Sequence, residues 1–124
     1  MTRAAPTASP AEPTTPRVVT LPERRAARLA AMARGLDALR DELRELPPGL
    51  GGRFLLYGSA ARGGMRPDSD VDLLLDFPDA TLDEAWRAAE EACRRHDLRG
   101  DIAPKRWMGA GFLAHALKAH EVLG

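Results

Sequence analysis

The most constraining stretch of this sequence reads LLYGSAARGGMRPDSDVDLLLDF and runs from Leu55 to Phe77. An apolar run ends at Gly-Ser, a loop rich in glycine and arginine follows, and a second apolar run then begins. Apolar runs of this length, bounded by glycine and proline, predict two short strands, at Arg53–Tyr57 and Val71–Phe77. Two carboxylates, Asp70 and Asp72, lie at the start of the second strand, where burial is costly for an unpartnered charge.

Strand alternation groups these acids on one face, because residues two apart in a strand point to the same side. The core face would hold Val71, Leu73, Leu75 and Phe77, and the other face Asp70, Asp72, Leu74 and Asp76. Asp70 and Asp72 would lie about 7 Å apart along the backbone. Their repulsion favours a divalent cation, and Mg²⁺ fits best because it prefers oxygen ligands. Asp76 would lie ~13 Å from Asp72, too far to join them.

Further candidate residues flank this pair. Asp101 begins the short apolar run Asp101–Ala103, a predicted third strand, and could supply a third carboxylate; a turn aspartate is the alternative interpretation. Gly58 would let a ligand approach the backbone without a Cβ in the way. The Ser59 hydroxyl could donate to a phosphate oxygen, and Arg62 and Arg66 could neutralise phosphate charge.

The remaining pattern predicts helices around the strands. A helix is predicted over Leu21–Leu46 with Thr20 as N-cap, because leucine and methionine recur at spacings of three and four from Leu29 to Leu46. This stripe is expected to pack on the protein's own sheet, although a partner protein is the alternative. Further helices are predicted at Leu82–His96 and Phe112–Val122. The expected class is α/β (α+β), with a small mixed sheet flanked by helices in one domain over residues 21–124.

Composition limits the class of protein. Residues 1–20 are rich in proline and poor in large apolar side chains, so a disordered tail is predicted there. The formal net charge is zero, which gives no indication of direct nucleic-acid or membrane binding. No apolar run approaches the ~20 residues of a membrane span. Cys93 is the single cysteine, so no internal disulfide can form and a cytoplasmic location is expected.

Two better-known motifs fail on detail. The segment from Gly58 to Gly63 has the glycine spacing of a P-loop, but Gly64 and Met65 stand where lysine and serine or threonine are required. The three aspartates from Asp68 onward mimic the start of an EF-hand loop, but the glycine and the final glutamate of that loop are missing.

The segment GSAARGGMRPDSDVDL resembles the nucleotidyltransferase superfamily, specifically its minimal members, the MNT proteins encoded with HEPN partners. The matching features are Gly-Ser, a spacer of roughly ten residues, Asp-x-Asp in an apolar strand, the Ala-Arg-Gly after Gly-Ser and the serine before the first aspartate. The resemblance covers about Leu21 to Val122.

This resemblance implies transfer of a nucleoside monophosphate, AMP from ATP or another nucleoside triphosphate, to a protein hydroxyl. Asp70, Asp72 and Asp101 would be the catalytic residues and the ligands of two Mg²⁺ ions. Gly58, Ser59, Arg62 and Ser69 would bind the nucleotide. The protein would act as an antitoxin that forms a hetero-oligomer with a HEPN ribonuclease toxin and adenylylates one of its tyrosines.

Two other functions stay open at this point. The chain could be a catalytically idle antitoxin that inhibits its partner by binding alone, because the leucine stripe of Leu21–Leu46 could face a partner. It could also modify a small molecule, such as an aminoglycoside, although such enzymes usually carry additional structure.

Overall fold

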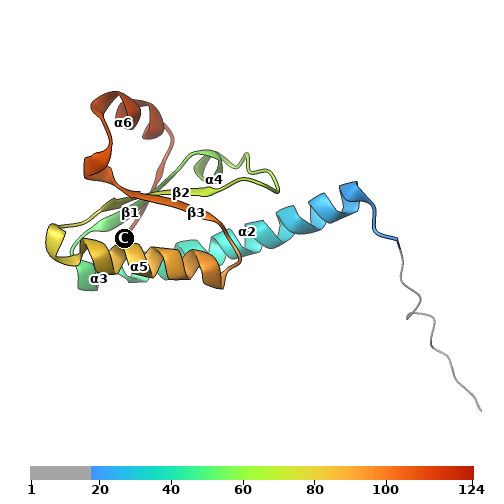
Figure 1. Cartoon of the computed structure of the whole chain (residues 1–124), viewed down its shortest axis with the longest axis horizontal. Coiled ribbons are helices and arrows are strands. Elements are labelled where there is room, and N and C mark those ends of the chain that lie inside the picture. The colour runs from blue at the N-terminus through green and yellow to red at the C-terminus, as the bar shows by residue number, and fades with distance from the viewer. Residues whose placement is uncertain (1–17) are drawn as a thin grey trace, which may run out of the picture.

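The structure of the protein is a computed structural model that describes residues 18–124. Figure 1 shows a four-stranded sheet with helices on both faces, which confirms the predicted mixed α/β class. The predicted tail of residues 1–20 falls almost entirely outside the described residues. Within them, no helix has the length and apolar character that crossing a membrane requires.

The first described helix, α2 (Leu21–Glu45), begins after Thr20, the N-cap that the sequence predicted, and the structure adds a capping box with Glu23. The Thr20 hydroxyl accepts a hydrogen bond from the Glu23 N–H at 3.2 Å, and the Glu23 carboxylate accepts one from the Thr20 N–H at 3.1 Å. Two otherwise unsatisfied donors of the first turn are thereby paired. The helix ends before Pro47, and a single helical turn follows, α3 (Pro47–Leu50).

The sheet contains β1 (Arg53–Tyr57), β2 (Val71–Asp76), β3 (Gly100–Pro104) and β4 (Glu121–Leu123) in the order β3-β2-β1-β4. β1 pairs antiparallel with β2 and with β4, whereas β2 and β3 are parallel. The three predicted strands are present within a residue or two of their predicted bounds. Pro104 is tolerated because β3 is an edge strand, where a missing N–H need not break the ladder.

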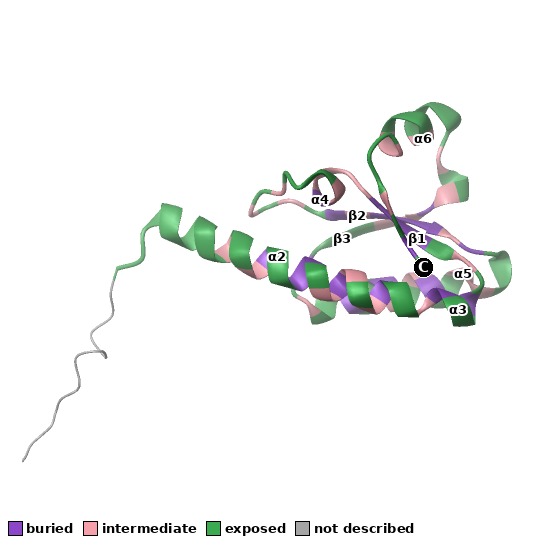
Figure 2. Ribbon diagram, turned by 180° about the vertical axis from the view of Figure 1, so that it is seen from behind, coloured by how far each residue is buried: buried purple, intermediate pink, exposed green. Residues whose placement is uncertain are grey.

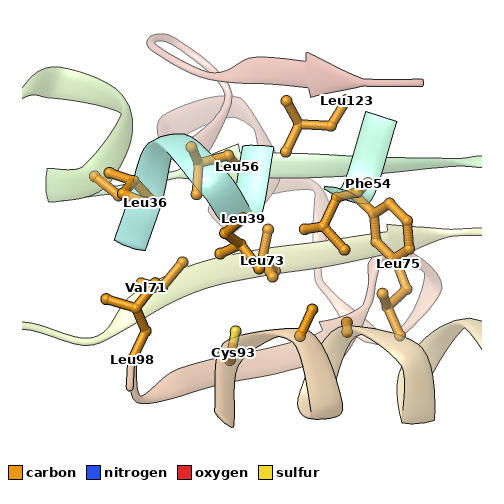
Figure 3. Packing of buried hydrophobic residues seen from close by; sticks show 14 of the residues in the cluster. Leu36, Leu39, Phe54, Leu56, Val71, Leu73, Leu75, Cys93, Leu98 and Leu123 are labelled. Atoms are coloured by element: carbon orange, nitrogen blue, oxygen red, sulfur yellow. The ribbon is translucent and has the colours of Figure 1, made fainter. Parts of the chain in front are cut away.

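The core lies between the sheet and the helices α2, α3 and α5 (Asp79–Arg95), which cover one face (Figure 1). Figure 3 shows Leu36 and Leu39 of α2 facing Leu56 of β1 and Leu73 of β2. Leu39 is 1% exposed and Leu73 fully buried. The middle of the α2 stripe therefore packs on the protein's own sheet, as the first of the two interpretations predicted.

The first turns of α2 extend beyond this core. Figure 2 shows this end of the helix as exposed, in contrast to the buried stripe further along. Leu21 is 65% exposed and Leu29 36% exposed, whereas Met32 is 2% exposed. The apolar stripe thus continues past the point at which the body of the protein covers it.

The C-terminal prediction was partly wrong. Instead of one helix over Phe112–Val122, a short helix α6 (Ala110–Ala116) precedes the strand β4, and no residue of α6 is buried. Leu123 of β4 is fully buried, whereas Val122, expected to be available for burial, is 44% exposed. The reason is non-local: β1 would otherwise leave the hydrogen-bonding groups of one edge unpaired, and β4 pairs with them.

Candidate active site

Three polar side chains form a row across three neighbouring strands. Tyr57 of β1 lies opposite Asp72 of β2, and Asp72 lies beside Asp101 of β3. Cross-strand neighbours project to the same face of a sheet, so this row lies on the face opposite α2 and α5. The two-residue alternation predicted for Asp72 is thereby observed, and Asp101 lies in a neighbouring strand as the sequence predicted.

The glycine turn after β1 lies against this row. Gly58 adopts φ 71° and ψ −152°, a conformation essentially restricted to glycine. A Cβ at this position would collide with the Oδ2 atom of Asp72. Gly58 is therefore required twice, once by its backbone angles and once because the Asp72 carboxylate occupies the space beside it.

The electrostatics of the row are unfavourable. The pKa of the Asp72 carboxyl is raised above its usual range, first by burial and then by the negative charges of Asp101 and Asp70, with Arg62 acting in the opposite direction. The pKa of Tyr57 is raised to about 12, again first by burial and then by Asp72 and Asp101. Like charges and partial burial both disfavour ionisation here.

Asp72 is also singular among the acids of the described chain. Within residues 18–124 it has neither an ion pair nor a hydrogen bond, and the other acids that lack an ion pair are exposed. A half-buried carboxylate that makes no ion pair or hydrogen bond is unusual in a stable fold. Among these acids, Asp72 is therefore the one whose position most favours the binding of a cationic ligand.

Asp70 lies just before β2 and is contacted by Arg99, the residue that directly precedes β3. Its Oδ1 atom forms an ion pair with the Arg99 Nε atom at 3.2 Å, and Arg99 also donates a hydrogen bond to the Asp68 carbonyl at 2.6 Å. The described residues contain no group of three acidic, cysteine or histidine side chains gathered closely enough to hold a metal ion. Asp72 and Asp101 are neighbours, whereas Asp70 is engaged by an arginine.

The predicted nucleotide residues lie around the same turn. The helical turn α4 (Ser59–Arg62) follows Gly58 directly and ends at Gly63. The Ser59 hydroxyl makes no hydrogen bond to any described residue and remains available to a ligand. Arg62 is exposed at the end of α4. Ser69 has a local role, because its hydroxyl accepts from the Arg66 N–H at 2.8 Å and closes the loop that precedes Asp70.

Asp76 lies at the far end of β2, as the sequence predicted. Its Oδ2 atom accepts from Arg53 at 3.1 Å and lies 3.8 Å from the Lys105 ammonium. It shares the strand and the face of Asp72, but its charge is balanced by neighbouring cations. Asp76 is thus a useful internal comparison for Asp72.

Two residues of the site were missed at the level of sequence. Tyr57 stood in a predicted strand, and pairing that strand with the next across the loop would have placed it beside Asp72. The ring of Phe112 in α6 lies edge-on to the Tyr57 ring, with ring centroids 5.9 Å apart. Arg99, which contacts Asp70, carried no local signal because it stood in a generally basic stretch.

Three carboxylates beside a glycine turn are a donor set that suits Mg²⁺, a hard cation that takes oxygen ligands and retains water and phosphate oxygens in its shell. Asp72 and Asp101 fit this set by their position on adjacent strands. Asp70 lies close enough for its charge to raise the pKa of Asp72, but it would have to release Arg99 in order to bind the cation.

Carboxylates on adjacent strands beside a glycine turn are an arrangement that suits the binding of phosphate through a metal ion. A family model described as a nucleotidyltransferase domain matches residues 36–105, more than half of the chain, and the chain therefore belongs to the nucleotidyltransferase domain family. The general activity of this family is nucleotidyl transfer, and its members generally use a nucleoside triphosphate and Mg²⁺.

One solved structure is similar in part. It is the 1.40 Å crystal structure of a "putative nucleotidyltransferase" from Sulfolobus solfataricus, with 16% sequence identity and a TM-score of 0.40. The match covers 77% of this chain and 85% of the Sulfolobus chain. Comparison with curated proteins gives no match.

Proposed function

We propose that this protein transfers a nucleoside monophosphate, AMP from ATP, to a hydroxyl of a partner protein, and thereby acts as the antitoxin of a HEPN-type ribonuclease toxin. The observation that carries the catalytic part is the position of Asp72. It is a half-buried acid that makes no ion pair with any described residue, next to Asp101 and against Gly58. The antitoxin part is supported by the resemblance of the Gly58–Asp72 segment to the minimal nucleotidyltransferases.

In this proposal the residues divide the work among them. Asp70, Asp72 and Asp101 would hold two Mg²⁺ ions, which would neutralise the triphosphate charge. Gly58 admits the triphosphate to the backbone, while Ser59, Arg62 and Ser69 contact its oxygens. The acceptor oxygen forms a bond to the α-phosphorus, the bond from that phosphorus to the oxygen bridging to the β-phosphate breaks, and pyrophosphate leaves. Asp101 accepts the proton of the acceptor hydroxyl.

The test is a transfer assay with labelled ATP, Mg²⁺ and the product of the neighbouring gene. We expect label on the partner protein, and a loss of at least ~100-fold in the Asp72→Asn variant, because the charge that holds the cation is gone. Asp76→Asn is the matched control, since it makes the same chemical change on the same strand and face but outside the row.

Two outcomes would contradict the enzymatic proposal. One is equal transfer by the Asp72→Asn and Asp76→Asn variants. The other is the absence of labelled product with wild-type protein that binds the partner.

A second function, inhibition of the partner by binding alone, is favoured by one observation. The first turns of α2 expose Leu21 and Leu29 on the same stripe that further along packs into the core. Neutralisation of the partner that survives the Asp70→Asn/Asp72→Asn double substitution and is lost in a Leu29→Asp variant would establish this function instead.

A further inference from the structure

Arg40 joins three elements of the fold near the proposed site. From α2, its Nε atom donates to the Oε1 atom of Glu121 in β4 at 3.0 Å, and its Nη1 atom contacts Asp37 of the same helix at 3.2 Å. Its Nη2 atom donates to the carbonyl oxygen of Ala60 in α4 at 3.4 Å. The side chain is 22% exposed, so these contacts are partly shielded from water and stronger than surface pairs.

The Ala60 carbonyl needs an external donor. In the single turn α4, the N–H groups of Gly63 and Gly64 both donate to the Ser59 carbonyl, and none of the bonds of the turn's C-terminal cap goes to Ala60. The last carbonyls of a helix are unsatisfied unless a side chain or water supplies the donor. Among the described residues, Arg40 is the side chain that supplies it, and it is the hydrogen-bonding connection between this turn and α2.

Packing alone leaves this side of the turn loose. A hollow of about 290 Å³ opens between α2 and the turn, and Ala60, Gly63 and Met65 line one side of it. Arg40 and Asp37 are part of the opposite wall. The turn is anchored by Ala60, which is 2% exposed, but beside it side chains do not fill the space between turn and helix.

We propose that Arg40 is a positioning residue for the nucleotide: it fixes the turn Gly58–Arg62 through the Ala60 carbonyl, so that Gly58 and Ser59 meet the triphosphate in one arrangement. The inference rests on the proposed function, because that function assigns the turn to the nucleotide. Arg40 itself contacts neither Asp72 nor the expected position of the substrate, and acts through the backbone of α4.

The chain offers a matched control one helical turn away. The Nη2 atom of Arg44 donates to Oε2 of the same Glu121 at 2.7 Å, and its Nη1 atom lies 3.5 Å from Asp41. Its interactions resemble those of Arg40 except that it does not reach α4. Arg44→Gln therefore removes a comparable ion pair and leaves the Ala60 contact intact.

The experiment compares Arg40→Gln, Arg40→Lys and Arg44→Gln in two measurements. Hydrogen exchange of the amides of residues 60–64, followed by mass spectrometry without any ligand, reports how firmly the turn is held. Titration with ATP and Mg²⁺ in a calorimeter reports the dissociation constant. We expect about fivefold faster exchange and about fivefold weaker binding for Arg40→Gln, and less than twofold changes for Arg44→Gln.

Arg40→Lys separates positioning from general stability. A lysine ammonium keeps the charge facing Glu121 but lacks the planar fork that serves several partners at once. We expect this variant to keep the melting temperature close to that of the wild type and still to lose ATP affinity about as much as Arg40→Gln.

The two proposals fail in different ways. If exchange and ATP affinity respond equally to Arg40→Gln and Arg44→Gln, or respond to neither, Arg40 has no positioning role. If the wild type does not bind ATP with Mg²⁺, the proposed function fails and with it the nucleotide role of Arg40, even when the exchange measurement shows that Arg40 holds the turn.

Discussion

Replacing Gly58 by alanine tests the geometry of the site most directly. The backbone angles of Gly58, φ 71° and ψ −152°, lie in a region where a residue with a Cβ costs roughly 1–3 kcal/mol. The new Cβ would also collide with the Asp72 Oδ2 atom, and displacing a packed group adds about 1 kcal/mol. We therefore expect Gly58→Ala to lower the free energy of unfolding by about 3 kcal/mol.

Gly63→Ala is the matched control for this substitution. Gly63 has φ 78° and ψ 17°, the left-handed helical region, which costs a residue with a Cβ about 1–2 kcal/mol. Nothing lies within 4 Å of the position that its Cβ would take, so no collision adds to that cost. The same chemical change five residues later, at the other end of the same turn, should therefore destabilise the protein less.

The assay is urea denaturation of both variants, with and without Asp72→Ala. Removal of the Asp72 carboxylate abolishes the collision but not the backbone strain, so the double variant Gly58→Ala/Asp72→Ala should be more stable than additivity predicts by about 1 kcal/mol. Equal destabilisation by Gly58→Ala and Gly63→Ala, together with strict additivity, would refute the inference that the carboxylate rests against this glycine.

Three further predictions follow from burial and charge. Asp72→Asn should raise the melting temperature at neutral pH, because the raised pKa of Asp72 means that its ionised form opposes folding. The stability advantage of this variant should shrink as the pH falls through that pKa, because the wild-type carboxyl is then protonated. A pH-independent difference in melting temperature, measured by scanning fluorimetry, would contradict this prediction. Leu39→Ala, at a side chain 1% exposed, should cost about 2–5 kcal/mol in urea denaturation, whereas Leu29→Ala, at the exposed end of the same stripe, should cost less than ~1 kcal/mol. Cys93 should resist alkylation in the folded protein, because burial raises the pKa of its thiol to about 11, and should react at once in urea. Rapid labelling of the native protein would show that the face of α5 that carries Cys93 is not packed into the core.

Much of the fold follows from local sequence signals. The N-cap Thr20 indicated the start of α2, and the two short apolar runs indicated β1 and β2 within a residue of their observed bounds. The face of Asp72 followed from strand alternation alone. In each case the forces that fix the element act within a few residues, and a sequence pattern records them.

The last strand illustrates what sequence patterns could not give. The residues Leu113 to His120 include good helix formers, and β4 is only three residues long, too short to show an alternating pattern. What makes Glu121–Leu123 a strand is the open edge of β1, a partner more than sixty residues earlier in the chain. The contact between Asp70 and Arg99 is non-local in the same way, so no local pattern indicated a competing cation at the first aspartate.

Ion pairs with neighbouring basic residues explain how the fold tolerates an acidic face. Asp70 is paired with Arg99, and Asp76 with Arg53 and Lys105. In the row beside the glycine turn, Asp72 and Asp101 make no ion pair with any residue of 18–124. Two carboxylates on adjacent strands, one of them exposed, cost little enough for a domain of this size to fold. Their unpaired negative charge is concentrated beside Gly58, where a magnesium–triphosphate unit would approach. A fold with Asp72 neutralised in the same way as Asp76 would be more stable, but its active face would attract a cation less.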